Sequence, residues 1–120
     1  MNEVPFPVAD WRNDPHWLVK SFFNYVCEQR AFVKALDIIT QRCGYDYNEE
    51  YCVFPDPDDP DPRLHFSGVA FGIFGMFDDE EVVITEVEFW RYIQQAGLFW
   101  IEHNNADMDE VRRILLRIPG

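Results

Sequence analysis

Basic residues are scarce in this chain, and one long stretch has almost none. The 120 residues include 22 Asp and Glu against 10 Lys and Arg, which gives a formal net charge of −12. Between Cys43 and Trp90 there are 13 acidic residues and a single base, Arg63. The remainder holds nine acids and nine bases, so the whole net charge arises in the middle of the chain. Such a charge distribution disfavours nucleic acid and anionic membranes as partners and favours a basic protein.

Cysteines and long apolar runs are also few. Cys27, Cys43 and Cys52 form an odd set without paired short spacing. The first residues have neither the basic segment nor the apolar run of an export signal, and no apolar run approaches the ~18 residues of a membrane span. We therefore expect one cytoplasmic domain over residues 1–120, with free thiols and with Cys27 packed in a helical core.

Signatures of catalysis and metal binding are missing. His16, His65 and His103 are far apart, and no zinc spacing, phosphate-binding glycine loop or nucleophile motif occurs. The acidic run from residue 56 begins like a calcium loop but places Asp61 and Ser67 where that loop requires Gly and Glu. We therefore expect no enzyme activity, no cofactor and no metal.

The N-terminal part follows the spacing of amphipathic helices. Asp14 and Pro15 predict a helix start, because Asp caps helices and Pro suits the first helical position. Apolar residues then recur every three or four positions as far as Ile39, in one long helix or in two with a bend near Gln29. Gly44 predicts the stop.

The middle of the chain favours strands and the C-terminal part favours helices. Residues 50–54 predict a strand, the Asp/Pro run an exposed loop, residues 63–77 a strand bent at a glycine, and 78–81 a turn into a strand at 82–85. Thr85 with Glu88 and Asp107 with Glu110 predict capping boxes for two helices. The order of helices, strands and helices predicts an α+β fold with a small antiparallel sheet.

The acidic residues are either an inert solvated surface or an interface. Aromatic residues lie among them, and rings beside carboxylates are typical of a tight contact with a cationic protein. A straight strand between the two acidic loops would separate them by ~45 Å, so we expect one loop to dominate, and we favour the second. The candidate partner-binding residues are Tyr47 and Glu49, then Asp56, Asp58, Asp59 and Asp61 in the first loop, and Asp78, Asp79, Glu80 and Glu81 in the second.

The second half of the chain resembles a known family. An aromatic–glycine strand contains Phe66, Gly68, Val69, Phe71 and Gly72, and a strand-to-helix join contains Val83, Ile84, Thr85, Glu86, Glu88 and Phe89. With the final helical segment, these residues resemble the CdiI-type immunity proteins of bacterial contact-dependent growth inhibition systems, which pair with ribonuclease toxins. The resemblance covers roughly the last sixty residues, and the long Asp/Pro loop is not part of it.

The resemblance and the charge together predict a function. We expect an immunity protein that binds a basic nuclease toxin domain of the CdiA C-terminal type and covers its active site. Two alternatives stay open at this point: an acidic mimic of nucleic acid that occupies a DNA- or RNA-binding protein, and a small hydrolase that uses paired carboxylates.

Overall fold

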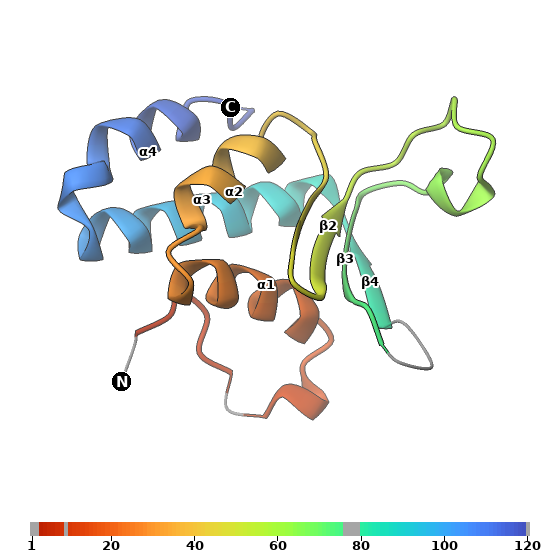
Figure 1. The fold of residues 1–120 in the computed structure, drawn as a ribbon, viewed down its shortest axis with the longest axis horizontal. Coiled ribbons are helices and arrows are strands. Elements are labelled where there is room, and N and C mark those ends of the chain that lie inside the picture. The colour runs from red at the N-terminus through yellow and green to blue at the C-terminus, as the bar shows by residue number, and fades with distance from the viewer. Residues whose placement is uncertain (1–2, 9, 76–79, 120) are drawn as a thin grey trace.

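The chain folds into helices on one side of a small antiparallel sheet, as the computed structural model shows (Figure 1). The structure describes residues 3–8, 10–75 and 80–119. Helices α1 (Trp17–Glu28) and α2 (Phe32–Ile39) precede the sheet, and α3 (Glu86–His103) and α4 (Met108–Leu115) follow it. The predicted α+β class is confirmed. No described helix combines the length and apolar character that crossing a membrane requires.

The N-terminal helical region consists of two helices. Arg30 adopts a left-handed backbone with φ 57°, and the Ala31 amide donates back to the Val26 carbonyl at 2.9 Å. This turn separates α1 from α2, which the apolar spacing alone could not distinguish from one long helix. The predicted start at Asp14 was wrong by a few residues, because α1 begins at Trp17 and the Asp14 carboxylate instead accepts from the His16 amide within the preceding turn.

Helix α2 ends earlier than Gly44 would place it. Its last helical residue is Ile39, and Thr40 follows as the cap. The left-handed position is taken by Arg42, whose φ is 62°. The prediction that Gly44 stops the helix was therefore wrong, since the chain has already turned two residues earlier.

Four strands form the sheet in the order β1 (Tyr45–Tyr47), β2 (Glu50–Val53), β3 (Val69–Ile73) and β4 (Glu80–Ile84), all antiparallel. The sequence did not predict β1, which meets β2 through a two-residue turn at Asn48 and Glu49. Asn48 has a φ of 56°, a region that Asn tolerates better than most residues.

Strand β3 is much shorter than the predicted strand over residues 63–77. Residues Pro62–Leu64 instead form a 3₁₀ turn, and Gly68 reaches a φ of 103° just before the strand. A side chain could not replace its hydrogen, because a Cβ there would lie 2.1 Å from the Ile84 carbonyl oxygen. The predicted bend at a glycine therefore lies at the entry to β3. Glu80 and Glu81, expected in the turn, belong to β4.

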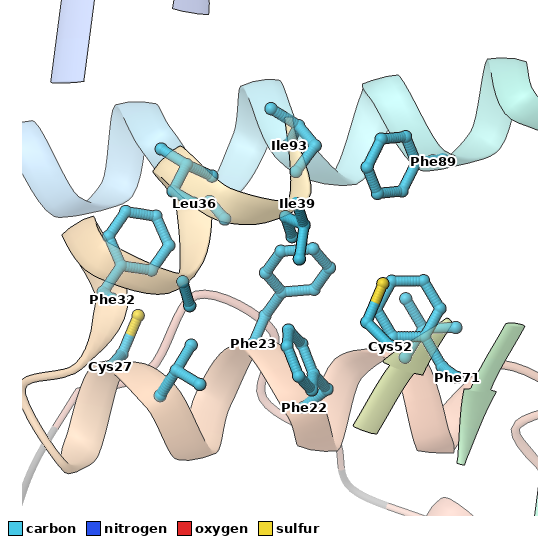
Figure 2. Packing of buried hydrophobic residues seen from close by; sticks show 14 of the residues in the cluster. Phe22, Phe23, Cys27, Phe32, Leu36, Ile39, Cys52, Phe71, Phe89 and Ile93 are labelled. Carbon is cyan, nitrogen blue, oxygen red and sulfur yellow. The ribbon is translucent and has the colours of Figure 1, made fainter. Parts of the chain in front are cut away.

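The core lies between one face of the sheet and the helices. Figure 2 shows side chains of α1, α2, α3 and the strands converging, and the Phe22 and Phe71 ring centroids lie 5.3 Å apart. Phe89 of α3 contacts the same cluster. Burying large rings from three helices and a sheet supplies most of the driving force for such a small domain. Cys27 is buried in this cluster, as predicted.

The C-terminal helices confirm one predicted cap and correct the other. Thr85 and Glu88 form the full capping box at the start of α3. Asp107 does not cap α4 with its side chain; its carboxylate accepts instead from the Trp100 indole at 2.9 Å. The two helices pack closely, since a Cβ at Gly97 would lie 2.7 Å from a Leu115 methyl.

Candidate partner-binding surface

The register of the sheet brings one group of predicted residues together. Tyr47 of β1 pairs with Glu50 of β2, Glu50 pairs with Ile73 of β3, and Ile73 pairs with Glu80 of β4. The start of β2, the end of β3 and the start of β4 therefore meet at one end of the sheet. The sheet-end surface, as we name it, comprises Tyr47, Glu49, Tyr51, Phe74, Glu80 and Glu81.

Aromatic and acidic side chains interact within the sheet-end surface. The Tyr51 hydroxyl donates to the Glu81 carboxylate at 2.7 Å. The Tyr51 and Phe74 ring centroids lie 4.7 Å apart, and Phe74 is 50% exposed. The backbone of Phe74 is fixed in turn, because its amide donates to the Glu49 carbonyl at 2.8 Å. Sequence reasoning missed Phe74 and the Tyr51–Glu81 pair, because only strand register brings these residues together.

Gly72 makes this arrangement possible. A Cβ at Gly72 would lie 2.3 Å from the Tyr51 hydroxyl oxygen and 2.6 Å from the Glu80 carbonyl oxygen. The Tyr51 ring therefore crosses β3 over Gly72, which has no side chain to obstruct it. This packing holds the hydroxyl beside Glu81 and so orients a carboxylate at the surface.

The Asp/Pro loop lies at the opposite end of the sheet. It runs between the end of β2 and the start of β3, and Figure 1 shows it projecting away from the helices. Strand β3 spans five residues, and at 3.3 Å per residue its ends lie about 13 Å apart. The continuous straight strand behind the ~45 Å estimate is therefore absent, because β3 covers only Val69–Ile73, but Asp56–Asp61 and Glu80–Glu81 do lie toward different ends of the sheet.

Three of the four carboxylates of this loop, those of Asp56, Asp59 and Asp61, bind groups within the loop. Asp56 accepts from the Asp58 amide at 3.1 Å, and Asp59 accepts from the Asp61 amide at 2.8 Å. Asp61 binds Arg63 at 2.8 Å, and the hydrogen bond to that side chain lowers the pKa of the Asp61 carboxyl. The loop therefore uses its Asp residues to shape a proline-rich turn, which is a structural reason for their presence.

The other predicted residues divide between the described and undescribed parts of the chain. Asp78 and Asp79 fall within residues 76–79, outside the described residues. The histidines contact separate groups: His16 bonds to Tyr92, His65 to the Asp59 carbonyl and His103 to Glu3. Among residues 3–8, 10–75 and 80–119, no cluster of His, Cys, Asp and Glu has the geometry of a metal site.

A second feature, absent from the sequence analysis, lies beside the sheet end. The N-terminal arm runs along α1, and a pocket with a volume of about 380 Å³ opens between them, lined by Trp11, Trp17 and Glu50 among others. Glu50 is only 9% exposed, and burial raises the pKa of its carboxyl. Glu50 and Cys52 are two positions apart in β2, so both side chains lie on the same face of the sheet, which packs against α1 and the core.

Comparisons with known proteins bear on the whole chain. The sequence model of a family described as CDI immunity protein matches residues 15–115. The crystal structure of the immunity protein NMB0503 from Neisseria meningitidis MC58 is similar in fold, with a TM-score of 0.75 at 13% identity over 98% of this chain and 99% of that one. A comparison with curated proteins found no match.

Proposed function

Because the chain belongs to the CDI immunity protein family, whose role is to neutralise a toxin, we propose that its toxin is a nuclease, most specifically a ribonuclease, with a basic active site. The chain covers that site and acts in the cytoplasm, where such a toxin meets its substrates. It works as a stoichiometric inhibitor and not as an enzyme. Neither nucleic acid nor a membrane takes part in the complex.

The sheet-end surface carries this proposal. Exposed Phe74 supplies an aromatic anchor, and Glu81, held by the Tyr51 hydroxyl, supplies an oriented carboxylate beside it. Interfaces gain most of their affinity from such central rings, and charges around them set the on-rate and the choice of partner. The 13 acids between Cys43 and Trp90 then form the matching field for a basic partner.

The chemistry of nucleases explains why this complement is acidic. A nuclease holds the phosphates of its substrate with Lys and Arg, so its cleft is positively charged and attracts any dense array of carboxylates. An acidic protein that occupies the cleft competes directly with the substrate. Neutralisation therefore needs no change in the toxin's fold.

The test uses the cognate toxin domain, which we expect a gene directly upstream of this one to encode. The purified domain is assayed on RNA and on DNA with increasing amounts of the chain, and we expect degradation to stop at one equivalent. An inactive variant of the same domain is then bound to a labelled RNA, and the chain should displace that RNA. A toxin without nuclease activity overturns the nuclease assignment, and inhibition with the RNA still bound overturns the covering mechanism.

A further inference from the structure

The pocket between the N-terminal arm and α1 has a firmly held outer wall. Asn24 of α1 clamps the arm through two hydrogen bonds, accepting from the Phe6 amide at 3.0 Å and donating to the Phe6 carbonyl at 2.9 Å. The Phe6 ring itself is buried and lies 5.1 Å from the Tyr92 ring. The arm therefore belongs to the folded domain, and the pocket beneath it is preformed.

Aromatic rings and carboxylates line this arm–helix pocket, which we define by Trp11, Trp17, Ser21, Tyr25, Glu28 and Glu50. The Trp11 and Trp17 rings meet edge to face at 5.2 Å, and Trp11 remains 53% exposed. Such an exposed indole in a preformed hollow offers its face to a ligand. Among the described side chains that line the pocket there is no Lys, Arg or His.

Glu50 is the unusual member of the lining. It is more than nine-tenths buried, and the hydrogen bond that it receives comes from the neutral Ser21 hydroxyl at 2.6 Å. Among the ion pairs of the described residues, none includes Glu50. The nearby Glu28 adds a like charge, which raises the cost of keeping Glu50 ionised. A buried carboxylate without a cation is costly, and a cation that entered the pocket would relieve that cost.

We propose that the arm–helix pocket receives an arginine side chain of the toxin domain, an inference that rests on the proposed function. The guanidinium group stacks on the Trp11 indole and donates to Glu50 and Glu28, while its alkyl stem lies along the rings. Arginine fits better than lysine because its planar fork both stacks on rings and binds two carboxylates at once.

The position of the pocket supports a role in the same complex. Glu50 opens β2 directly after Glu49 of the sheet-end surface. Trp17 also lines a neighbouring depression that contains Glu80 and Glu81. The pocket and the sheet-end surface therefore adjoin at one end of the sheet, where a partner that covers this end can contact both. Buried arginines in preformed pockets are frequent hot spots of protein interfaces.

A first experiment tests the pocket without the toxin. The full chain, labelled with ¹⁵N, is titrated with N-acetyl-arginine methylamide, with the lysine analogue and with the neutral glutamine analogue. We expect the indole signals of Trp11 and Trp17 to shift and saturate with the arginine probe, and those of Trp90 and Trp100 to stay. Glu50→Gln should weaken this binding about tenfold, equivalent to loss of a well-formed charge contact. Glu102→Gln removes the same charge elsewhere and should leave binding unchanged.

Several outcomes of the titration would overturn the proposal that the pocket binds arginine. Equal shifts with the glutamine probe, or full binding by Glu50→Gln, overturn the proposal. Tighter binding of the lysine probe also overturns it, since the stated preference is for arginine. Trp11→Ala provides an independent variant on an exposed residue, and we expect it to weaken the arginine probe by about 3-fold to 30-fold through loss of the cation–π contact.

A second experiment places the pocket in the toxin complex. Glu50→Gln, Trp11→Ala and the Glu102→Gln control are compared for inhibition of the toxin domain. Glu50→Gln should inhibit about tenfold less well and Trp11→Ala about 3-fold to 30-fold less well, whereas the control should inhibit normally. If the parent chain inhibits a nuclease and the pocket variants inhibit equally well, the pocket inference fails while the proposed function stands. If the parent inhibits no nuclease, the proposed function fails whatever the arginine probe does.

Discussion

Two groups of carboxylates lie at opposite ends of one small sheet, so they can be neutralised separately with the same change in total charge. A sheet-end triple replaces Glu49, Glu80 and Glu81 with Gln. A loop triple replaces Asp56, Asp58 and Asp59 with Asn. Each variant removes three negative charges from the formal net charge of −12. A difference in toxin binding between them therefore reports where the contact is, and not how much charge the chain carries.

The substitutions preserve local structure. Gln at position 81 keeps an oxygen that accepts from the Tyr51 hydroxyl, whose present bond is 2.7 Å long. Asn at positions 56 and 59 keeps the oxygen that accepts from the loop amides. Both triples should therefore unfold at nearly the temperature of the parent, which a thermal scan checks before any binding is measured.

The expected difference in affinity is large. Removing one partner of a desolvated charge pair at an interface costs about 2–5 kcal/mol, whereas an exposed pair contributes about 0–1 kcal/mol. Since about 1.4 kcal/mol is a factor of ten, one such pair at the sheet end predicts a Kd raised by about 30-fold to about 4,000-fold for the sheet-end triple. The loop triple should change the Kd by less than about tenfold.

The assay is equilibrium binding to the toxin domain at physiological salt, supported by survival of cells that express both proteins. A loop triple that binds as poorly as the sheet-end triple, or worse, would refute the assignment of the contact to the sheet end. If both triples bind and protect like the parent, the acidic residues are only a solvated surface, and the electrostatic part of the proposal is wrong.

Three further predictions concern the fold and its thiols. Replacing Cys27, Cys43 and Cys52 together with Ala should reduce stability, since two of them are buried, yet leave neutralisation intact; a folded variant that no longer neutralises would show that a thiol has a role. Gly72→Ala should lower the free energy of unfolding by about 1–3 kcal/mol, because the new methyl group meets a ring and a carbonyl; an unchanged urea midpoint would contradict this packing. Burial raises the folded-state pKa of Glu50, so its charge opposes folding above that pKa, and the stability that Glu50→Gln gains over the parent should shrink as the pH falls through it; a constant difference between pH 7 and pH 4 would show that Glu50 is not desolvated.

Local signals in the sequence predicted much of the fold. The Thr85–Glu88 capping box was confirmed because both hydrogen bonds involve residues within one helical turn. The Asp107 cap failed because its carboxylate has another partner, the Trp100 indole. That indole comes from a different helix, and no local pattern shows how the two helices pack. The three-residue strand β1 has too few residues for an alternating pattern to be visible.

The candidate site was less accessible to sequence reasoning. The acidic residues could be counted, but strand register decides which of them share an end of the sheet. The register places Glu80 opposite Ile73 and Ile73 opposite Glu50, so residues thirty positions apart lie at the same end of the sheet. One signal in the sequence pointed to the arm–helix pocket. Glu50 and Cys52 are two positions apart in a strand and therefore share a face. A Glu on the core face of a strand is rare enough to suggest a role.

The separation of the two acidic ends also assigns them different parts in association. Five residues of β3 place the loop at least about 13 Å from the sheet end, which exceeds the Debye length of ~8 Å at physiological salt. The loop charges are then largely screened from a toxin that docks at the sheet end. At ~0.01 M salt the Debye length is ~30 Å, comparable to the 42 × 32 × 23 Å molecule, so all the carboxylates act together. We therefore expect both triples to slow association equally at low salt, and only the sheet-end triple to slow it at physiological salt. On-rates measured by stopped flow across this range decide the point, because an on-rate of the parent that does not change with ionic strength would remove charge steering altogether.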